Sequence, residues 1–362
     1  MGYDISYTAT GDKVRYINLI DEITETELYE IVGLGAFDRI QCNFIPSTTS
    51  LELLNLYYSQ FPQTGFRLFG GRLKESIDVS FLSSLPAVRK LAIDDSWGRI
   101  TEAAAIGQLR ELESIEITAR AIDNFNFINE LPNTTRKFVC ETKAKNLDLS
   151  SLCRVPNLKT LGISGYKKNI EAIAELLLLE DLQLKGITLD SLDFINRMTK
   201  MSILKIEWGS ITDYSALYGN PQIKALRLFR INNFTDTNLL TSLPNLQAVE
   251  LSWLKHIESL PDLSKHKHLR HVSLDTMKSL TDLSGLECVE SLGSVSFFSC
   301  PSAFEPENIL PVLRNSSVQQ CSFYTSSQKK NDRISELILK SGKRDKHNSQ
   351  FITEMLYPEL YE

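Results

Sequence analysis

A short pattern of apolar positions recurs along most of the chain. An apolar residue is followed by two variable residues, a second apolar residue, one variable residue and a third apolar residue, as at 158–163, 179–184 and 223–228. The middle apolar position falls at residues 17, 40, 66, 91, 115, 138, 161, 182, 204, 226, 249, 272, 295 and 321. These fourteen units, spaced near 23 residues apart, predict a solenoid, because one unit cannot bury its apolar face whereas stacked units bury a continuous core.

The end of each unit alternates between variable and apolar residues. This alternation predicts a short strand whose apolar residues share one face. Stacked strands form a parallel sheet, with the variable residues on its other face. Adjacent strands lie ~4.8 Å apart, so thirteen steps predict a sheet on the order of 60 Å long.

The segments between the strands must return along the outer side of the solenoid. Short apolar spacings predict 3₁₀ turns or short helical turns at 148–152, 239–243 and 282–286. Longer helical patterns predict helices at 24–32, 50–59, 102–109 and 170–178.

With this apolar frame and unit length, the chain resembles leucine-rich repeat proteins, whose frame is L-x-x-L-x-L-x-x-N/C. The resemblance covers residues 14–325 and implies an α/β fold, a leucine-rich repeat solenoid. Its curved parallel β-sheet would form the concave face, and short helices and 3₁₀ turns the convex face. The chain departs from the family three residues after the last apolar position, where Asn or Cys is expected. From the seventh to the thirteenth unit this position holds such a residue once, Cys300, so the asparagine ladder is missing.

We expect one continuous solenoid with a cap at each end. The predicted organisation is an N-terminal cap segment at 1–13, the solenoid at 14–325, and a C-terminal cap helix and tail at 326–362. The helix is expected at 332–340, where apolar and polar residues alternate as on an amphipathic helix, and Gly342 ends it. The apolar and acidic tail at 351–362 either docks on the solenoid or is a short linear motif.

Charge and targeting signals narrow the classes of function. The 362 residues include 39 Lys and Arg and 45 Asp and Glu, for a net charge of −6, which argues against nucleic acid and anionic membrane as partners. No signal sequence is visible, and no apolar run approaches the ~18 residues that span a bilayer. Cys42, Cys140 and Cys321 fall on core positions and no C-x-x-C pair occurs, which is typical of reduced thiols. We therefore expect a cytoplasmic monomer.

No motif for phosphate binding, nucleophilic hydrolysis or zinc catalysis appears in the chain, so we expect no catalytic residues and no cofactor. The densest histidine cluster is His266, His268 and His271. On a strand, the first two would face one side and the third the other, so we predict no metal site. An enzyme with a site on the concave face or at the turn 266–271 is one alternative. A surface recognition protein that is missing its leader is another.

The variable strand residues carry the functional prediction, because they line the concave face in the family. Trp208 and Trp253 follow their strands in the same register two units apart, and Phe229 lies on the unit between them. Aromatic residues and arginine among mixed charges are typical of protein-binding hot spots. The competing interpretation is that the tryptophans fold inward over the strand ends as core.

We therefore predict a non-enzymatic scaffold that recognises another protein on its concave face, in an adaptor, inhibitor or immunity-type role. The residues predicted to bind the partner are Lys205, Glu207, Trp208, Arg227, Phe229, Arg230, Glu250, Trp253, Asp275 and Phe298.

Overall fold

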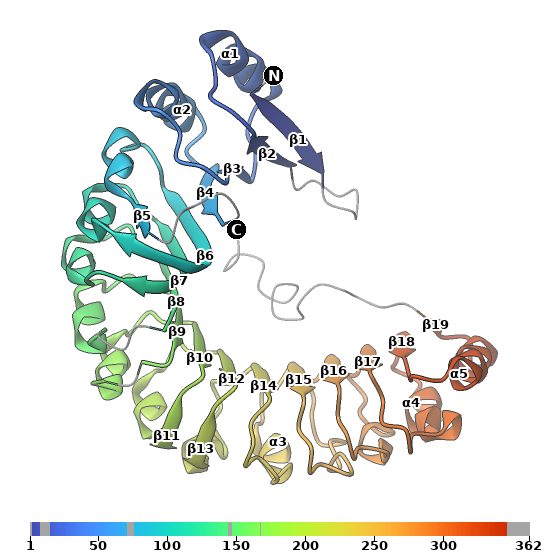
Figure 1. Cartoon of the computed structure of the whole chain (residues 1–362). Coiled ribbons are helices and arrows are strands. Elements are labelled where there is room, and N and C mark those ends of the chain that lie inside the picture. The colour runs from blue at the N-terminus through green and yellow to red at the C-terminus, as the bar shows by residue number, and fades with distance from the viewer. Residues whose placement is uncertain (1, 8–14, 71–75, 144–146, 167, 346–362) are drawn as a thin grey trace. The chain divides into compact units, whose positions relative to one another are not determined.

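The computed structural model describes residues 2–7, 15–70, 76–143, 147–166 and 168–345. The chain divides into two compact units, Met1–Leu179 and Glu180–Glu362. In each unit a parallel sheet is covered on one face by helices and 3₁₀ turns (Figure 1). The other face, which carries the variable strand residues, is called the open face below.

In the first unit the strands follow chain order, and each pairs in parallel with the next. They are β2 (Arg15–Leu19), β3 (Arg39–Cys42), β4 (Gly65–Phe69), β6 (Lys90–Thr101), β7 (Ser114–Ile122), β8 (Lys137–Thr142) and β9 (Thr160–Ser164). Strand β1 (Tyr3–Tyr7) adds to β2 in the antiparallel sense, and β5 (Ser76–Asp78) pairs with the end of β6. The middle apolar positions of the repeat meet in register, as Ile17, Ile40 and Phe66 do, and all three are buried.

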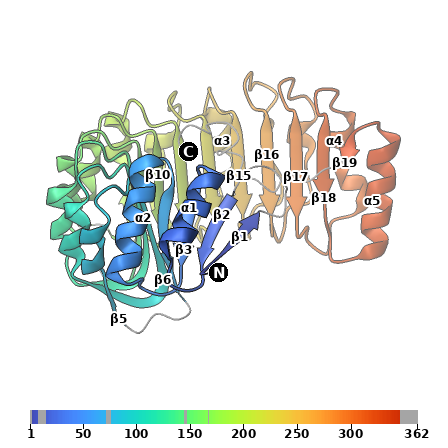
Figure 2. The same ribbon diagram turned by 90° about the horizontal axis from the view of Figure 1, so that it is seen from above.

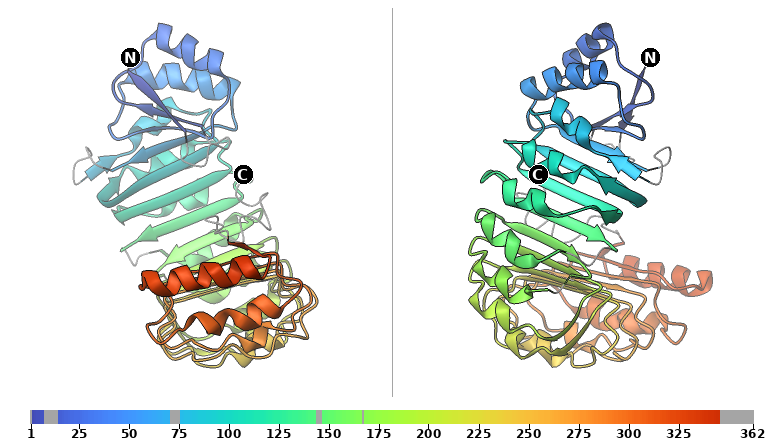
Figure 3. Two further views of the ribbon diagram at one scale, coloured as in Figure 1. Left: turned by 90° about the vertical axis from the view of Figure 1, so that its right-hand side faces the viewer. Right: turned by 60° about the vertical axis from the view of Figure 1, so that its left-hand side comes forward.

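The connections of the first unit change from helices to 3₁₀ turns along the chain. They are α1 (Glu25–Leu34), α2 (Thr48–Gln60), η1 (Ser80–Ser84), η2 (Ala103–Gln108), η3 (Asn126–Glu130), η4 (Leu149–Arg154) and η5 (Ile170–Glu175), and Figure 3 shows them along one side of the sheet. The predicted helices at 24–32 and 50–59 are confirmed as α1 and α2.

The predicted helices at 102–109 and 170–178 are wrong, since both segments are six-residue 3₁₀ turns. Each turn starts from a left-handed residue, Glu102 or Asn169, without a side-chain cap. By contrast, Thr24 and Glu27 form a capping box that satisfies the first amides of α1. Neighbouring turns also lie close together, because a Cβ on Gly107 of η2 would approach the Glu130 side chain of η3 to 2.7 Å. The narrow 3₁₀ turn suits this close spacing.

The second unit repeats the same architecture with shorter connections. Its parallel strands are β10 (Asp181–Lys185), β12 (Ile203–Glu207), β14 (Ala225–Phe229), β15 (Ala248–Ser252), β16 (His271–Asp275), β17 (Ser294–Phe298), β18 (Gln320–Phe323) and β19 (Arg344–Asp345). Figure 2 shows β15 to β18 side by side. Strands β11 (Thr188–Ser191) and β13 (Ser210–Asp213) form a small second sheet.

Short turns connect the strands of the second unit. They are η6 (Asp193–Arg197), η7 (Ser215–Leu217), α3 (Asn238–Ser242), η8 (Ser284–Leu286), η9 (Pro306–Ile309) and α4 (Leu310–Arg314). The turns predicted at 239–243 and 282–286 are confirmed as α3 and η8, and the one at 148–152 as η4 of the first unit.

Helix α5 (Gln328–Lys340) begins four residues before the predicted 332–340. Ser327 caps its first turn by accepting a hydrogen bond from the Lys330 amide at 3.4 Å. The first turn is polar throughout, so the apolar periodicity that guided the prediction starts only at Ile334, which is buried together with Ile338. The tail at 351–362 lies outside the described residues.

After three strands of the second unit, the positions where the family carries asparagine hold buried apolar side chains. Ile231, Leu254 and Met277 occupy these positions after β14, β15 and β16, and all are buried. In these three repeats apolar packing therefore takes the place of asparagine side chains, and the core extends to the ends of the strands.

Candidate functional site

A column of left-handed residues marks the ends of five neighbouring strands in the second unit. The residues are Trp208, Arg230, Trp253, Thr276 and Ser299, with φ between 49 and 57°; we call them the rim residues. After β10 the same position holds Gly186, also with positive φ. A left-handed backbone costs about 1–2 kcal/mol for a residue with a side chain but little for glycine. Trp208, Arg230 and Trp253 therefore place large side chains at positions where glycine would adopt the backbone conformation at lower cost.

Backbone hydrogen bonds hold the rim residues in place. The Trp208 amide donates to the Phe229 carbonyl at 2.9 Å, and the Arg230 amide to the Ser252 carbonyl at 2.8 Å. In the same way, the Trp253 amide donates a hydrogen bond to the Asp275 carbonyl at 2.9 Å. These three rim residues are thus tied to the next strand, which fixes where their side chains start.

The two tryptophans of the rim are not core residues. Their exposed fractions are 48% for Trp208 and 37% for Trp253. The Lys185 ammonium lies 4.8 Å from the ring centroid of Trp208, and the Arg230 guanidinium 5.7 Å from that of Trp253. Phe229 meets the Trp208 ring edge to face at 5.5 Å. This edge of the sheet therefore presents aromatic faces and cations together.

Below the rim, the charged residues of the predicted site form ion pairs with one another. Lys205 Nζ lies 2.9 Å from an oxygen of Asp181, and the two side chains are 7% and 2% exposed. Arg227 Nε lies 3.3 Å from both Glu207 and Glu250. Because buried charges are costly unless they are paired, these contacts set the geometry of the open face. Burial raises the pKa of the Glu250 carboxyl, and the nearby Arg227 opposes this effect.

The ten predicted residues therefore divide by position. Trp208, Phe229, Arg230 and Trp253 share one edge, while Lys205 and Glu207 are buried beneath it. The remaining predicted residues are the half-buried Arg227, Glu250, Asp275 and Phe298.

Asp275 and Phe298 lie further along the sheet. Asp275 accepts a hydrogen bond from the Thr276 hydroxyl at 2.9 Å, and Phe298 stacks on Tyr324 at 5.4 Å. Sequence reasoning did not select Asp181 or Lys185. Their register opposite the strand that carries Lys205 and Glu207 is the signal that could have found them.

The histidine cluster is dispersed in the structure. His266 is buried, and His271 lies on β16 with its Nδ1 at 2.7 Å from the Ser294 hydroxyl. Among the described residues, no group of three or more His, Cys, Asp or Glu side chains could hold a metal ion. No carboxylate of a described residue hydrogen-bonds the His271 ring, so the Ser–His pair lacks the third group that orients a catalytic base.

The stacked units of one strand and one turn, with apolar residues in register, define a leucine-rich repeat solenoid. An internalin of Listeria monocytogenes has a TM-score of 0.51 with this chain at 15% sequence identity, covering 91% of this chain and 90% of the internalin chain. The structure of the Toll–Spatzle complex of Drosophila has a TM-score of 0.54 at 12% identity, covering 99% of this chain and 53% of the matched chain. This chain thus spans about half the length of that second match.

At these identities the structural similarity establishes the fold. No family model and no curated protein sequence matches the chain. Over the described residues, the helices are all too short or too polar to cross a membrane.

Proposed function

We propose that this protein is a non-enzymatic scaffold that holds a partner protein at the rim of its second unit. The observation that carries the proposal is the presence of Trp208, Arg230 and Trp253 at left-handed positions. Bulky side chains there lower stability relative to glycine, and such strained positions cluster where a protein binds or reacts. Exposed tryptophan and arginine are also the residues that dominate protein-binding hot spots.

The ion pairs under the rim give this surface a fixed shape before binding. Lys205, Glu207 and Arg227 are held by carboxylates or a guanidinium of the neighbouring strands. Preorganised side chains lose less conformational entropy on association. We assign Lys205 and Glu207 a positioning role, and assign the contact with the partner to Trp208, Phe229, Arg230 and Trp253.

Fold analogy supports a protein partner. In the Toll–Spatzle structure the matched fold is part of a complex of two proteins. The adaptor, inhibitor and immunity-type roles all fit a scaffold of this kind, acting as a monomer. A reducing compartment such as the cytoplasm fits the cysteines, because all six are free and four of them are buried.

The test is an affinity capture from a lysate of the source organism. The wild-type chain is compared with a Trp208→Ala/Phe229→Ala/Trp253→Ala variant whose folding is verified by circular dichroism. Truncating a hot-spot residue costs about 2 kcal/mol, which is roughly thirtyfold in affinity, so three truncations should abolish capture.

The control is a Tyr29→Ala/Leu56→Ala/Leu177→Ala variant, which removes three exposed apolar side chains of the first unit. A protein captured by the wild type and the control but lost by the rim variant would support the proposal. Equal capture by all three chains would exclude the rim. The absence of any captured protein would favour the enzyme alternative.

A further inference from the structure

Trp97 is held out from the first unit by a bulge in β6. The pairing of β6 with β7 shifts register between Asp95 and Arg99. Within this interval Trp97 is 79% exposed, the largest exposed fraction of any large apolar side chain in the described residues. Tryptophan is usually well buried, so this exposure points to a surface that contacts something else.

The bulge is rigidly supported from below. The Asp95 carboxylate is buried and accepts hydrogen bonds from the Trp97 amide at 3.0 Å and the Gly98 amide at 3.1 Å. A Cβ on Gly98 would approach the Ile77 side chain to 2.8 Å, and one on Gly70 would approach Asp95 to 3.0 Å. Two glycines and one buried carboxylate therefore fix the backbone from which the Trp97 ring projects.

One cation contacts the ring of this tryptophan, and two arginines lie on the neighbouring strand segments. The Lys143 ammonium lies 5.6 Å from the ring centroid of Trp97. Arg120 lies next to Lys143, because its carbonyl accepts a hydrogen bond from the Lys143 amide at 3.2 Å, and Arg99 follows Trp97 on β6. All three cations are exposed, and none forms an ion pair with another described residue. The nearby Asp94 carboxylate forms an ion pair with Arg67.

We propose that Trp97, Arg99, Arg120 and Lys143 form a second interaction surface that binds an acidic polypeptide segment. We call it the Trp97 surface. Carboxylates of the segment would pair with the three cations, and its apolar side chains would pack on the indole ring. This surface is local to the first unit and does not depend on the rim.

A polypeptide fits this surface better than nucleic acid. Duplex binding at physiological salt rests on roughly 6–10 phosphate contacts, whereas this surface offers three cations on a chain of net charge −6. A short acidic peptide can place single carboxylates at these cations without bringing a long polyanion close to the remaining acidic surface.

The test uses a chain in which Trp97 is the only tryptophan, made by Trp208→Phe and Trp253→Phe. The probe is a twelve-residue peptide of alternating acidic and apolar residues, Glu-Leu-Glu-Tyr repeated three times. Binding is followed by the change in Trp97 fluorescence and by the anisotropy of a label on the peptide. The matched probes are the same peptide with lysine in place of glutamate, and a single-stranded oligothymidine of twelve nucleotides.

Two charge variants of equal net charge locate the binding. Arg120→Glu/Lys143→Glu should weaken the acidic peptide by about tenfold or more, since two attractive pairs become repulsive. Arg110→Glu/Arg154→Glu changes two exposed arginines, one just after η2 and one at the end of η4, and should leave the affinity unchanged. Trp97→Ala should weaken the peptide in the anisotropy measurement.

The proposal is overturned if the acidic peptide does not bind, or if both charge variants weaken it equally. Tighter binding of the oligothymidine would assign the surface to nucleic acid instead. The test chain already lacks the rim tryptophans. A loss of peptide binding at the Trp97 surface can therefore be told apart from a loss of partner binding at the rim.

Discussion

Trp208 and Trp253 adopt a backbone conformation that glycine reaches without a steric penalty, and glycine does occur at the same position in Gly186. Each ring is partly exposed to solvent and lies beside a cation. Because each ring is only partly buried, packing of the ring offsets only part of the cost of this conformation. At the scale of the residue, backbone stability favours glycine at these positions, whereas the proposed binding of a partner favours tryptophan.

We predict that Trp208→Gly is more stable than Trp208→Ala by about 1 kcal/mol. Both variants lose the indole ring, but only glycine removes the left-handed strain. Urea denaturation of the two variants measures the difference. If the alanine variant is as stable as the glycine variant, Trp208 is not strained in the folded protein.

Burial of a histidine predicts how stability depends on pH. Burial lowers the pKa of His266, against a smaller opposing effect of its hydrogen bond to the Leu240 backbone. The unfolded chain therefore takes up a proton at this residue at higher pH than the folded chain does. The corresponding stability is present above the unfolded pKa of 6.5 and is lost as pH falls toward the lowered value.

We expect His266→Leu to lose less stability than the wild type between pH 7 and pH 5. Chemical denaturation at each pH measures this difference, and His256→Gln, at an exposed histidine, is the control. An unchanged pH dependence in the His266 variant would show that this residue does not titrate in that window.

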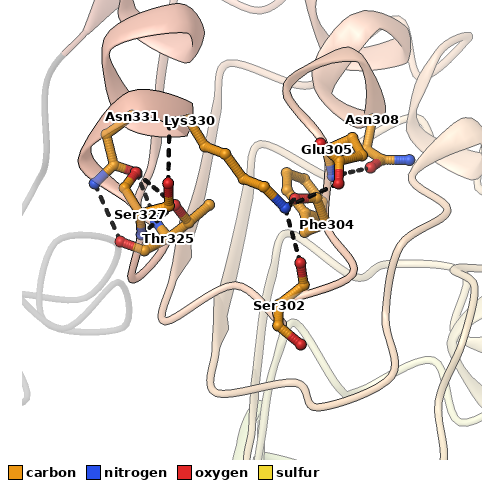
Figure 4. A network of polar contacts seen from close by, with 8 residues as sticks. All are labelled: Ser302, Phe304, Glu305, Asn308, Thr325, Ser327, Lys330 and Asn331. Atoms are coloured by element: carbon orange, nitrogen blue, oxygen red, sulfur yellow. Dashed lines mark hydrogen bonds and ion pairs between the residues drawn. The ribbon is translucent and has the colours of Figure 1, made fainter.

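At the scale of the element, helix α5 is anchored by one lysine. Lys330 Nζ donates to the carbonyls of Ser302 and Phe304 at 2.8 and 2.9 Å and lies 2.9 Å from the Glu305 carboxylate (Figure 4). The next residue, Asn331, accepts hydrogen bonds from the Thr325 amide and hydroxyl and donates one to the Thr325 carbonyl. Lys330 therefore links α5 to the turn that follows β17.

Lys330→Met should destabilise the protein by about 1–3 kcal/mol, because the side chain keeps its length but loses its charge-assisted hydrogen bonds. Amide hydrogen exchange should increase within α5. Lys329→Met is the matched control, since Lys329 is exposed and should tolerate the change. Equal protection of α5 in the two variants would contradict the anchoring role.

At the scale of the whole molecule, the cysteines report on the packing of the repeats. Burial raises the pKa of the Cys42, Cys140, Cys300 and Cys321 thiols to about 12, while Cys153 and Cys288 are exposed. The four buried thiols come from three separate regions of the solenoid, with Cys300 and Cys321 in adjacent repeats, so they become reactive only when those repeats open.

We predict that a thiol-specific reagent titrates two cysteines in the native protein at pH 8 and six in urea. The reactive thiolate is absent from the core because burial disfavours its charge. Liquid chromatography and mass spectrometry of labelled peptides identify which residues react. Rapid labelling of Cys140 or Cys321 without denaturant would show that the core is open.

The apolar pattern determined the repeat strands, their parallel order and the fold, because two-residue alternation and a repeat near 23 residues are local properties of the sequence. Ile17, Ile40 and Phe66 show this, since they were predicted in one column and meet in register. The aromatic and charged edge around Trp208 could also be located from the sequence as a site prediction, since its residues share a register.

Only the tertiary structure decided which of those residues face solvent. Lys205 and Glu207 are at variable positions, yet ion pairs from neighbouring strands bury them, and those neighbours are 20 or more residues away in the chain. The left-handed backbone of Trp208 and the anchoring contacts of Lys330 are equally invisible in the sequence. The exposure of a side chain, its backbone strain and its ion pairs depend on the neighbouring strand of the sheet. The periodicity of apolar residues depends only on the residues within a unit.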